Sequence, residues 1–335
     1  MKRAIGFLVC AVLLGTAALP SRAQLQLGGL MRDEYALGLT PTIKSAGMGG
    51  AYVGVEGTQS MNPAALSMVD YMEAVLTYGN YNHDDGPMAH RGRLDATLPV
   101  PYIGGAARLM LDHLESEDDE RTLLGAPIEF DSSTLGLQYG RNVTDWWALG
   151  IGGYPYEKAN VDMILGPGAR IDADAFSQIG SFQAGTLFRP HEKVTIGGQL
   201  IYIIDELEAD VPGAGEWNDD YYISYVALGA SFRPFKGTLL AVDYWNGEIR
   251  GDQTPVLELK DDTDIDRWNF GIQQRVCSYC DLRIGSNNGG FTTGFSLHVL
   301  KNLDIDYAYV NKALRDKEMV WGDTEYHGVS VTYRF

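Results

Sequence analysis

The chain has 335 residues and a formal net charge of −18, with 45% hydrophobic and 11% aromatic residues. So acidic a chain lacks the clustered Lys and Arg that phosphate binding requires, which excludes nucleic acid as a partner. After the first 23 residues no stretch approaches roughly 18 consecutive apolar residues, so the sequence predicts no transmembrane helix.

The chain begins with the features of a signal peptide. Lys2 and Arg3 form a positively charged start, Ile5 to Leu14 an apolar core, and Ser21-Arg22-Ala23 a cleavage site of small residues. We therefore predict that residues 1–23 are removed, which takes the formal charge from −18 to −21 because three basic residues leave and no acidic ones do. An exported chain without a spanning helix is either soluble outside the cytoplasm or a β-barrel in an outer membrane.

The mature chain shows no linker between two halves. Residues 24–69 lack long segments of alternating polarity, whereas residues 70–335 consist of such segments separated by turns rich in Gly, Pro, Asn and Asp. These predict fourteen strands, at 71–82, 88–98, 101–112, 128–140, 146–156, 175–189, 193–204, 220–233, 238–249, 266–276, 281–287, 290–299, 302–311 and 325–335. The prediction is an all-β protein built as a 14-stranded antiparallel transmembrane β-barrel.

The connections between these strands alternate in length. Those after even-numbered strands are short, at 99–101, 142–145, 190–192, 234–237, 277–280 and 300–302, and most others are long and charged, at 113–120, 157–173, 205–220, 251–266 and 311–325. Short periplasmic turns and long extracellular loops are typical of bacterial outer-membrane barrels, whereas a soluble sandwich has no reason to sort its loops in this way.

The two faces of the strands differ in polarity. In the strand that ends the chain, Val329, Val331, Tyr333 and Phe335 would face lipid. Polar residues on the opposite faces of three strands would line the lumen, and these are Arg267, Gln273, His298, Asp304 and Asp306. An exported soluble sandwich is the alternative, but it would have to explain inward-pointing acids on consecutive strands.

A barrel of fourteen strands is too wide to be filled by its own inward side chains. Residues 24–69 are the candidate to fill it, and they contain the stretch SAGMGGAYVGVEGTQSMNPAALS at residues 45–67. This stretch resembles the N-terminal signature of the FadL-type outer-membrane transport family, including its PorV/PorQ-like branch. The last strands, from FTTGFSLHVLKNLDIDYAYV to the closing aromatic strand, look similar to those of the family as well.

The resemblance implies a fourteen-stranded barrel plugged by an N-terminal hatch at residues 24–69. Carried over to this chain, the hatch and ligand-gating residues are Gly47, Gly49, Gly50, Asn62, Pro63 and Ala64. Independently of any family, Gly permits positive φ and close packing, Pro fixes φ, and Asn bonds backbone groups that an irregular plug leaves unpaired. For each residue, a well-packed turn without movement or ligand contact is the alternative.

The resemblance further implies a passive outer-membrane conduit for small hydrophobic, fatty-acid-like compounds. The chain is short for this family, and its predicted extracellular loops are acidic where larger members carry an apolar cap. The alternative function is therefore a PorV-like scaffold of a protein secretion system, whose loops bind exported protein cargo. Outer-membrane lipid and lipopolysaccharide, reached through divalent cations bridged by acidic loops, are the other expected partners, and no cofactor is expected.

Two cysteines remain after processing, Cys277 and Cys280. Their spacing resembles a thioredoxin-type redox pair, but they occupy a short turn of a barrel, which argues against redox catalysis. Because the periplasm is oxidising, we expect a disulfide between them that adds little stability, since it closes a very short loop.

Catalytic and metal sites are not predicted. The strongest candidate for catalysis is His298 with Ser296, two residues apart on one strand face and close to Asp304 and Asp306, yet a polar lumen wall produces the same arrangement. The acidic runs at 115–120 and 261–264 do not have the spacing of a calcium-binding loop.

Overall fold

The structure, a computed structural model, describes residues 41–83, 88–116, 122–123, 126–166, 169–177, 181–211, 215–251, 263–313 and 324–335. Two short helices come first, α3 (Ile43–Ala46) and η1 (Pro63–Met68). The strands are β1 (Glu73–His83), β2 (Ala89–Pro99), β3 (Ala106–Ser116), β4 (Thr122–Leu123), β5 (Ala126–Thr144), β6 (Trp147–Gly166), β7 (Ala169–Ser177), β8 (Phe182–His191), β9 (Val194–Val211), β10 (Gly215–Phe232), β11 (Thr238–Gly251), β12 (Thr263–Cys277), β13 (Cys280–Asn287), β14 (Gly290–Leu300), β15 (Leu303–Val310) and β16 (Thr324–Arg334). Among the described residues, none of the helices is both long and apolar enough to cross a membrane.

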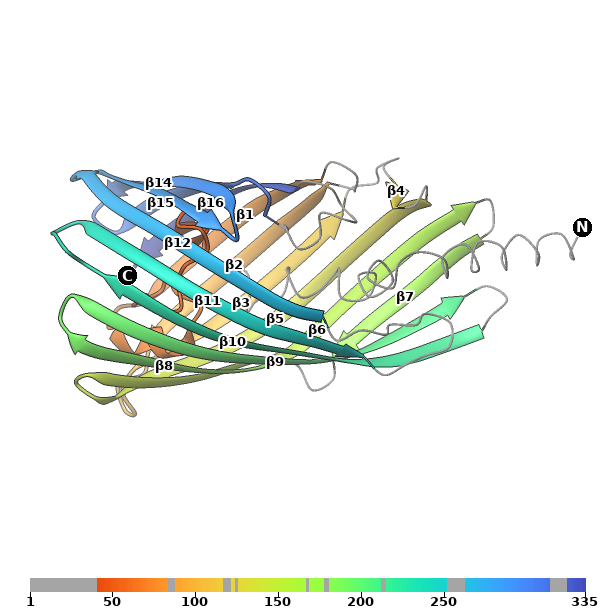
Figure 1. The fold of residues 1–335 in the computed structure, drawn as a ribbon, viewed down its shortest axis with the longest axis horizontal. Coiled ribbons are helices and arrows are strands. Elements are labelled where there is room, and N and C mark those ends of the chain that lie inside the picture. The colour runs from red at the N-terminus through yellow and green to blue at the C-terminus, as the bar shows by residue number, and fades with distance from the viewer. Residues whose placement is uncertain are drawn as a thin grey trace, which may run out of the picture.

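The strands form one closed antiparallel barrel (Figure 1). β1 pairs with β16 over their full length, which closes the sheet and removes its edges. β7 and β8 both lie between β6 and β9 and share one position in the wall, while the two-residue β4 pairs only with β5. The wall therefore has fourteen strand positions, and the predicted 14-stranded barrel is confirmed.

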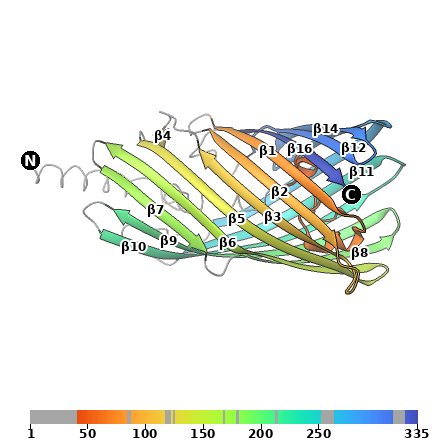
Figure 2. The same ribbon diagram turned by 180° about the vertical axis from the view of Figure 1, so that it is seen from behind.

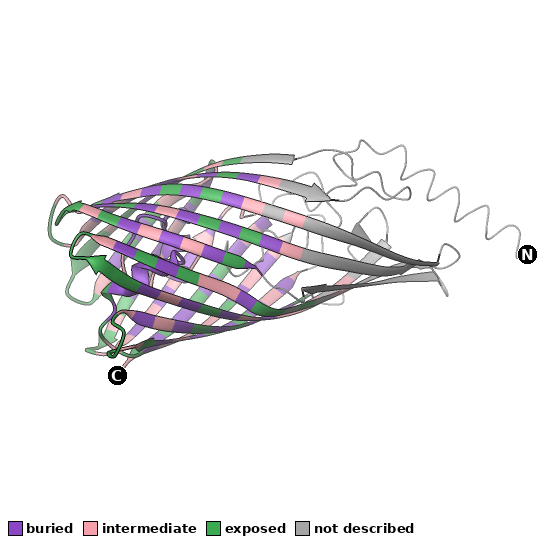
Figure 3. Ribbon diagram, turned by 90° about the horizontal axis from the view of Figure 1, so that it is seen from below, coloured by how far each residue is buried: buried purple, intermediate pink, exposed green. Residues whose placement is uncertain are grey.

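The strands of the wall alternate between the lumen and the outside wherever the burial of their residues is described (Figure 3). The last strand behaves as predicted, because Val329, Val331 and Tyr333 are exposed while the residues between them are buried. Trp268 and Phe270 of β12 are likewise about half exposed, at 51% and 49%. A band of exposed Leu, Ile, Val, Phe, Tyr and Trp that surrounds a protein has no place in water, so this outer surface is that of a transmembrane barrel.

Two of the predicted long loops are wrong. Residues 157–173 and 205–220 are largely strand, because β6 and β7 pair up to Gly166 and Ala169, and β9 and β10 up to Val211 and Gly215. The hydrogen bonds of a β-ladder are made by backbone N–H and C=O groups and do not depend on the side chains. Acidic residues can therefore continue a hairpin beyond the apolar band. Of the loops predicted at 113–120, 251–266 and 311–325, residues 117–120, 252–262 and 314–323 lie outside the described residues.

An inner segment, residues 41–72, lies inside the barrel. Figures 1 and 2 show it within the wall, near the end that carries the C-terminus and the short turns. Met48, Ala51, Val53, Met61 and Ala64 are at most 1% exposed, although the segment contains only two helices of four and six residues. The wall buries this segment, because it has too little regular structure to bury itself. The predicted boundary at residue 24 lies outside the described residues.

Candidate functional site

Glycines of the wall bring the inner segment into direct contact with barrel backbone. A Cβ placed on Gly150 of β6 would overlap the backbone N of Ala64, and one on Gly197 of β9 would overlap the carbonyl O of Val53. Four more wall glycines approach the segment's backbone in the same way, and these are Gly140, Gly229, Gly271 and Gly285. Glycine inside a strand marks such close approach of another backbone, so the wall is shaped to receive this segment.

Asn62 fastens the middle of the inner segment to the wall. Its Nδ2 donates to the carbonyl oxygens of Val53 at 2.9 Å, Thr186 at 3.2 Å and Gly198 at 3.3 Å, so it joins the segment to itself and to β8 and β9. Its Oδ1 accepts from the backbone N of Ala64 at 3.0 Å, which caps η1. Pro63 occupies the first position of η1, where a missing N–H costs nothing.

Asp243 of β11 holds the turn that precedes Asn62. Its Oδ2 accepts the backbone N–H groups of Tyr52 at 2.6 Å and Val53 at 2.8 Å, and the whole side chain is buried. A carboxylate that accepts two backbone N–H groups is a strong, charge-assisted anchor. Sequence reasoning missed this residue, although an acid between Leu240 and Trp245 at an inward-facing position was a visible signal.

The glycine run is seated against β12, β13 and β14. Gly49 and Gly50 have φ values of +71° and +75°, which are costly for residues with a side chain. The N–H of Gly49 donates to Thr292 Oγ1 at 2.8 Å, and this hydroxyl donates to the Gly47 carbonyl at 3.2 Å. The positive φ of these two glycines is therefore a requirement of the backbone.

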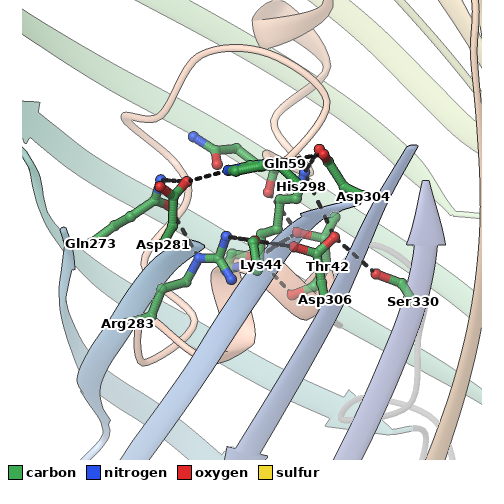
Figure 4. Close-up of polar contacts among 12 residues, drawn as sticks. Thr42, Lys44, Gln59, Gln273, Asp281, Arg283, His298, Asp304, Asp306 and Ser330 are labelled. Atoms are coloured by element: carbon green, nitrogen blue, oxygen red, sulfur yellow. Dashed lines mark hydrogen bonds and ion pairs between the residues drawn. The ribbon is translucent and has the colours of Figure 1, made fainter. Parts of the chain in front are cut away.

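A cluster of charged side chains holds the start of the inner segment at the short-turn end (Figure 4). The Nζ of Lys44 lies 3.5 Å from Asp304 and 3.7 Å from Asp306, both buried on β15. Arg283 of β13 lies 3.6 Å from Asp306, and Arg334 of β16 lies 2.8 Å from Asp304. Lys44 is thus the cation that the inner segment contributes to this network, and the other charged side chains come from strands of the wall.

His298 extends this network but does not form a catalytic triad. Its Nδ1 lies 2.7 Å from Asp304 and its Nε2 3.3 Å from Asp281, so the imidazole bridges two carboxylates. Ser296 bonds instead to Asp306 and Arg283. Serine and histidine therefore engage different acids, and the arrangement suits an electrostatic clamp better than nucleophilic attack.

The other two predicted lumen residues lie on β12. Gln273 donates to Asp281 at 3.2 Å and accepts from Arg283 at 3.1 Å, so it belongs to the same charged cluster. Arg267 lies apart from it and borders a cavity with Tyr52 and Trp245. The sequence indicated both residues by alternation alone, and alternation does not show that they lie in different parts of the lumen.

The predicted disulfide is not present. Cys277 and Cys280 face each other across the turn between β12 and β13, yet both are free thiols. The Cys277 sulfur accepts from the backbone N of Tyr279 at 3.4 Å, and the Cys280 thiol contacts the Asp281 carbonyl at 3.7 Å. Each sulfur therefore points along its own backbone instead of across the turn.

The apolar part of the lumen adjoins the inner segment. Tyr52, Val53 and Met61 of the segment pack with wall residues that share low exposure, and these are Met110, Tyr154, Ile201, Ile203, Tyr225, Ala227 and Trp245. Burial raises the pKa of the Tyr52 phenol well above its usual range, so it remains neutral. The lumen thus combines an aromatic and sulfur-containing region with a charged one at the short-turn end.

Fold and site together define a membrane-type β-barrel whose lumen is occupied by its own N-terminal residues. Solved structures share this fold. The toluene transporter TbuX of Ralstonia pickettii has a TM-score of 0.59 at 14% identity, over 90% of this chain and 99% of that one. A Pseudomonas aeruginosa FadL homologue has a TM-score of 0.57 at 14% identity, over 88% and 98%.

The toluene transporter TodX of Pseudomonas putida has a TM-score of 0.58 at 13% identity, over 87% of this chain and 96% of that one. The chain therefore has the fold of the FadL-type transporters, as its N-terminal stretch indicated. No protein-family model and no curated protein matches the sequence.

Proposed function

We propose that this protein is an outer-membrane conduit through which small hydrophobic compounds pass without an energy source. The observation that supports this function best is the inner segment, which lies inside a lipid-facing barrel next to an aromatic and methionine-containing region. The similar structures include transporters of toluene and a FadL homologue. Two of these are named as toluene transporters, which favours a conduit over the secretion scaffold.

We further propose that displacement of the inner segment gates the conduit. Its polar attachments to the wall are distributed along the segment, from Lys44 near its start to Asn62 in its middle, with wall side chains such as Asp243 and Arg108 between them. A segment held in this way can be released at one end while its other attachments remain. Fatty-acid-like compounds are the expected cargo, with lipid around the apolar band. Of the acidic runs expected to reach lipopolysaccharide, at 115–120 and 261–264, residues 117–120 and 261–262 lie outside the described residues.

The gating proposal is tested by locking the segment. A Cβ added to Gly47 would lie 3.5 Å from the Cβ of Arg283 on β13, which is within the Cβ–Cβ range of a disulfide. Gly47→Cys with Arg283→Cys, in a chain where Cys277→Ser and Cys280→Ser remove the native thiols, would be reconstituted in vesicles with a fluorescent fatty acid outside.

We expect uptake by the reduced protein and little uptake by the oxidised one. The same sample in its two redox states is the control, so differences in folding or insertion do not enter. Equal uptake in both states, with the cross-link verified by mass spectrometry, would refute gating by this segment. Uptake no faster than in empty vesicles in either state, and also with the wild-type barrel, would refute the conduit itself.

A further inference from the structure

A small cavity lies between the inner segment and the half of the wall that carries the longer connections. Its volume is about 70 Å³. Five aromatic rings border it, and these belong to Tyr52, Tyr81, Tyr225, Trp245 and Tyr326. All five are at most 6% exposed. The cavity is therefore separate from the charged cluster around Lys44 and is of a different chemical kind.

The rings on one side of the cavity are arranged edge to face, and the pair on the other side is tilted. Trp245 meets Tyr52 at a centroid distance of 5.6 Å and an interplanar angle of 63°, and Tyr225 at 6.4 Å and 73°. On the other side, Tyr81 and Tyr326 lie 4.6 Å apart. Such walls offer both ring faces and ring edges, which an aromatic guest prefers.

The size of the cavity limits the guest. A dry cavity of about 150 Å³ holds one benzene molecule, so a space of about 70 Å³ takes at most a single ring, and only when its walls move apart. A long acyl chain does not fit without displacement of the inner segment. The cavity therefore suits a monocyclic compound.

The charged side chain that lines the cavity determines which substituent the ring of the guest should carry. Aromatic cages are well suited to bind cations, but among the described residues that line this cavity Arg267 is the only charged one. A guanidinium disfavours a cationic guest and favours a carboxylate or another hydrogen-bond acceptor. The remaining polar side chains, Asn269 and Asn287, add further hydrogen-bonding capacity.

We propose that this cavity binds a single aromatic ring that carries an anionic or hydrogen-bond-accepting substituent, with Arg267 binding the substituent and Trp245 and the tyrosines binding the ring. This inference rests on the proposed function, because it names the compound class that the conduit would admit. The similar structures are named for toluene, which has the ring without the substituent. Arg267 would therefore distinguish this chain from a pure hydrocarbon channel.

The test compares sodium benzoate with toluene. Binding of each to the purified full-length barrel in detergent would be measured by calorimetry, with the wild type and with Arg267→Gln. Lys301→Gln is the matched control, because it also removes one positive charge but lies exposed in the turn between β14 and β15. Arg267→Lys is a second variant, which keeps the charge and loses the two-pronged geometry.

We expect benzoate to bind the wild type more tightly than toluene does, and Arg267→Gln to weaken benzoate binding about tenfold to a hundredfold while toluene binding stays the same. Arg267→Lys should lose part of the benzoate affinity, and Lys301→Gln none. Toluene binding without benzoate binding, or benzoate binding that Arg267→Gln and Arg267→Lys both leave unchanged, would overturn the inference and leave the conduit standing. Failure of both ligands to bind would overturn the inference, and the vesicle assay above decides separately whether the conduit fails as well.

Discussion

Replacement of Asn62 by Ala should release the middle of the inner segment from the wall. The side chain is fully buried and bonds three carbonyl oxygens and one backbone N–H, so alanine removes all of these contacts at once. Its Nδ2 has two hydrogens, which means that two of the three carbonyl contacts at most are full hydrogen bonds.

The size of the effect follows from what remains unpaired. The carbonyl of Val53 and the N–H of Ala64 lose their partner in a site without exposed surface, and each such group costs about 1–3 kcal/mol. The carbonyls of Thr186 and Gly198 keep their partners in the paired strands β8 and β9. Water entering the vacated space would offset part of this, so we expect a loss of about 3 kcal/mol for seating of the inner segment. At about 1.4 kcal/mol per factor of ten, local opening should become roughly a hundredfold more frequent.

Hydrogen–deuterium exchange with mass spectrometry would measure this opening. Peptides covering residues 51–66 should exchange about a hundredfold faster in Asn62→Ala, whereas peptides from β1, β2 and β16 should be unchanged. Asn246→Ala is the matched control, because the Asn246 amide bonds Asp266 in an exposed contact away from the inner segment.

Equal exchange of residues 51–66 in the wild type and in Asn62→Ala would refute the conclusion that this amide fastens the segment. Faster exchange of the whole barrel would refute it differently, because it would show that Asn62 stabilises the fold and not the seating of one segment. Channel conductance in planar bilayers separates release of the inner segment from destabilisation of the whole barrel. It is expected to rise in Asn62→Ala and to stay unchanged in the control Asn246→Ala.

Three further predictions follow from the site. Lys44→Met leaves two buried carboxylates without this cation. The short-turn end of the inner segment should therefore exchange faster, and single-channel conductance should rise. If neither changes, Lys44 does not hold the segment. Gly197→Ala should lower the thermal midpoint of the barrel by several degrees because its Cβ overlaps inner-segment backbone, whereas Gly92→Ala, with open space around its Cβ, should leave it unchanged; equal midpoints would refute the close approach. On unreduced mature protein, a maleimide should label Cys277 faster than the less exposed Cys280, and absence of labelling at both would show that they are joined after all.

The sequence by itself determined the barrel, because its cause is local. Alternation of polar and apolar residues fixes which side of each strand meets lipid, and this alternation is readable one segment at a time. Thirteen of the fourteen predicted strands therefore appear near their predicted places, whereas the strand predicted at 175–189 is divided between β7 and β8. The other differences are in length, most of all beyond 157 and 205, because pairing of a hairpin depends on the partner strand and not on the polarity of its own residues.

Only the tertiary structure decided how the lumen is filled. The Asn-Pro-Ala stretch could be read from the sequence, but Thr186 and Gly198, the wall residues that its Asn62 bonds, lie more than a hundred residues away. Arg267 and His298 appear equivalent in the sequence, as polar residues on inward faces, yet one borders an aromatic cavity and the other bridges carboxylates. The physical reason is that alternation assigns a side chain to a face, whereas barrel closure and the path of the inner segment decide which residues it meets there.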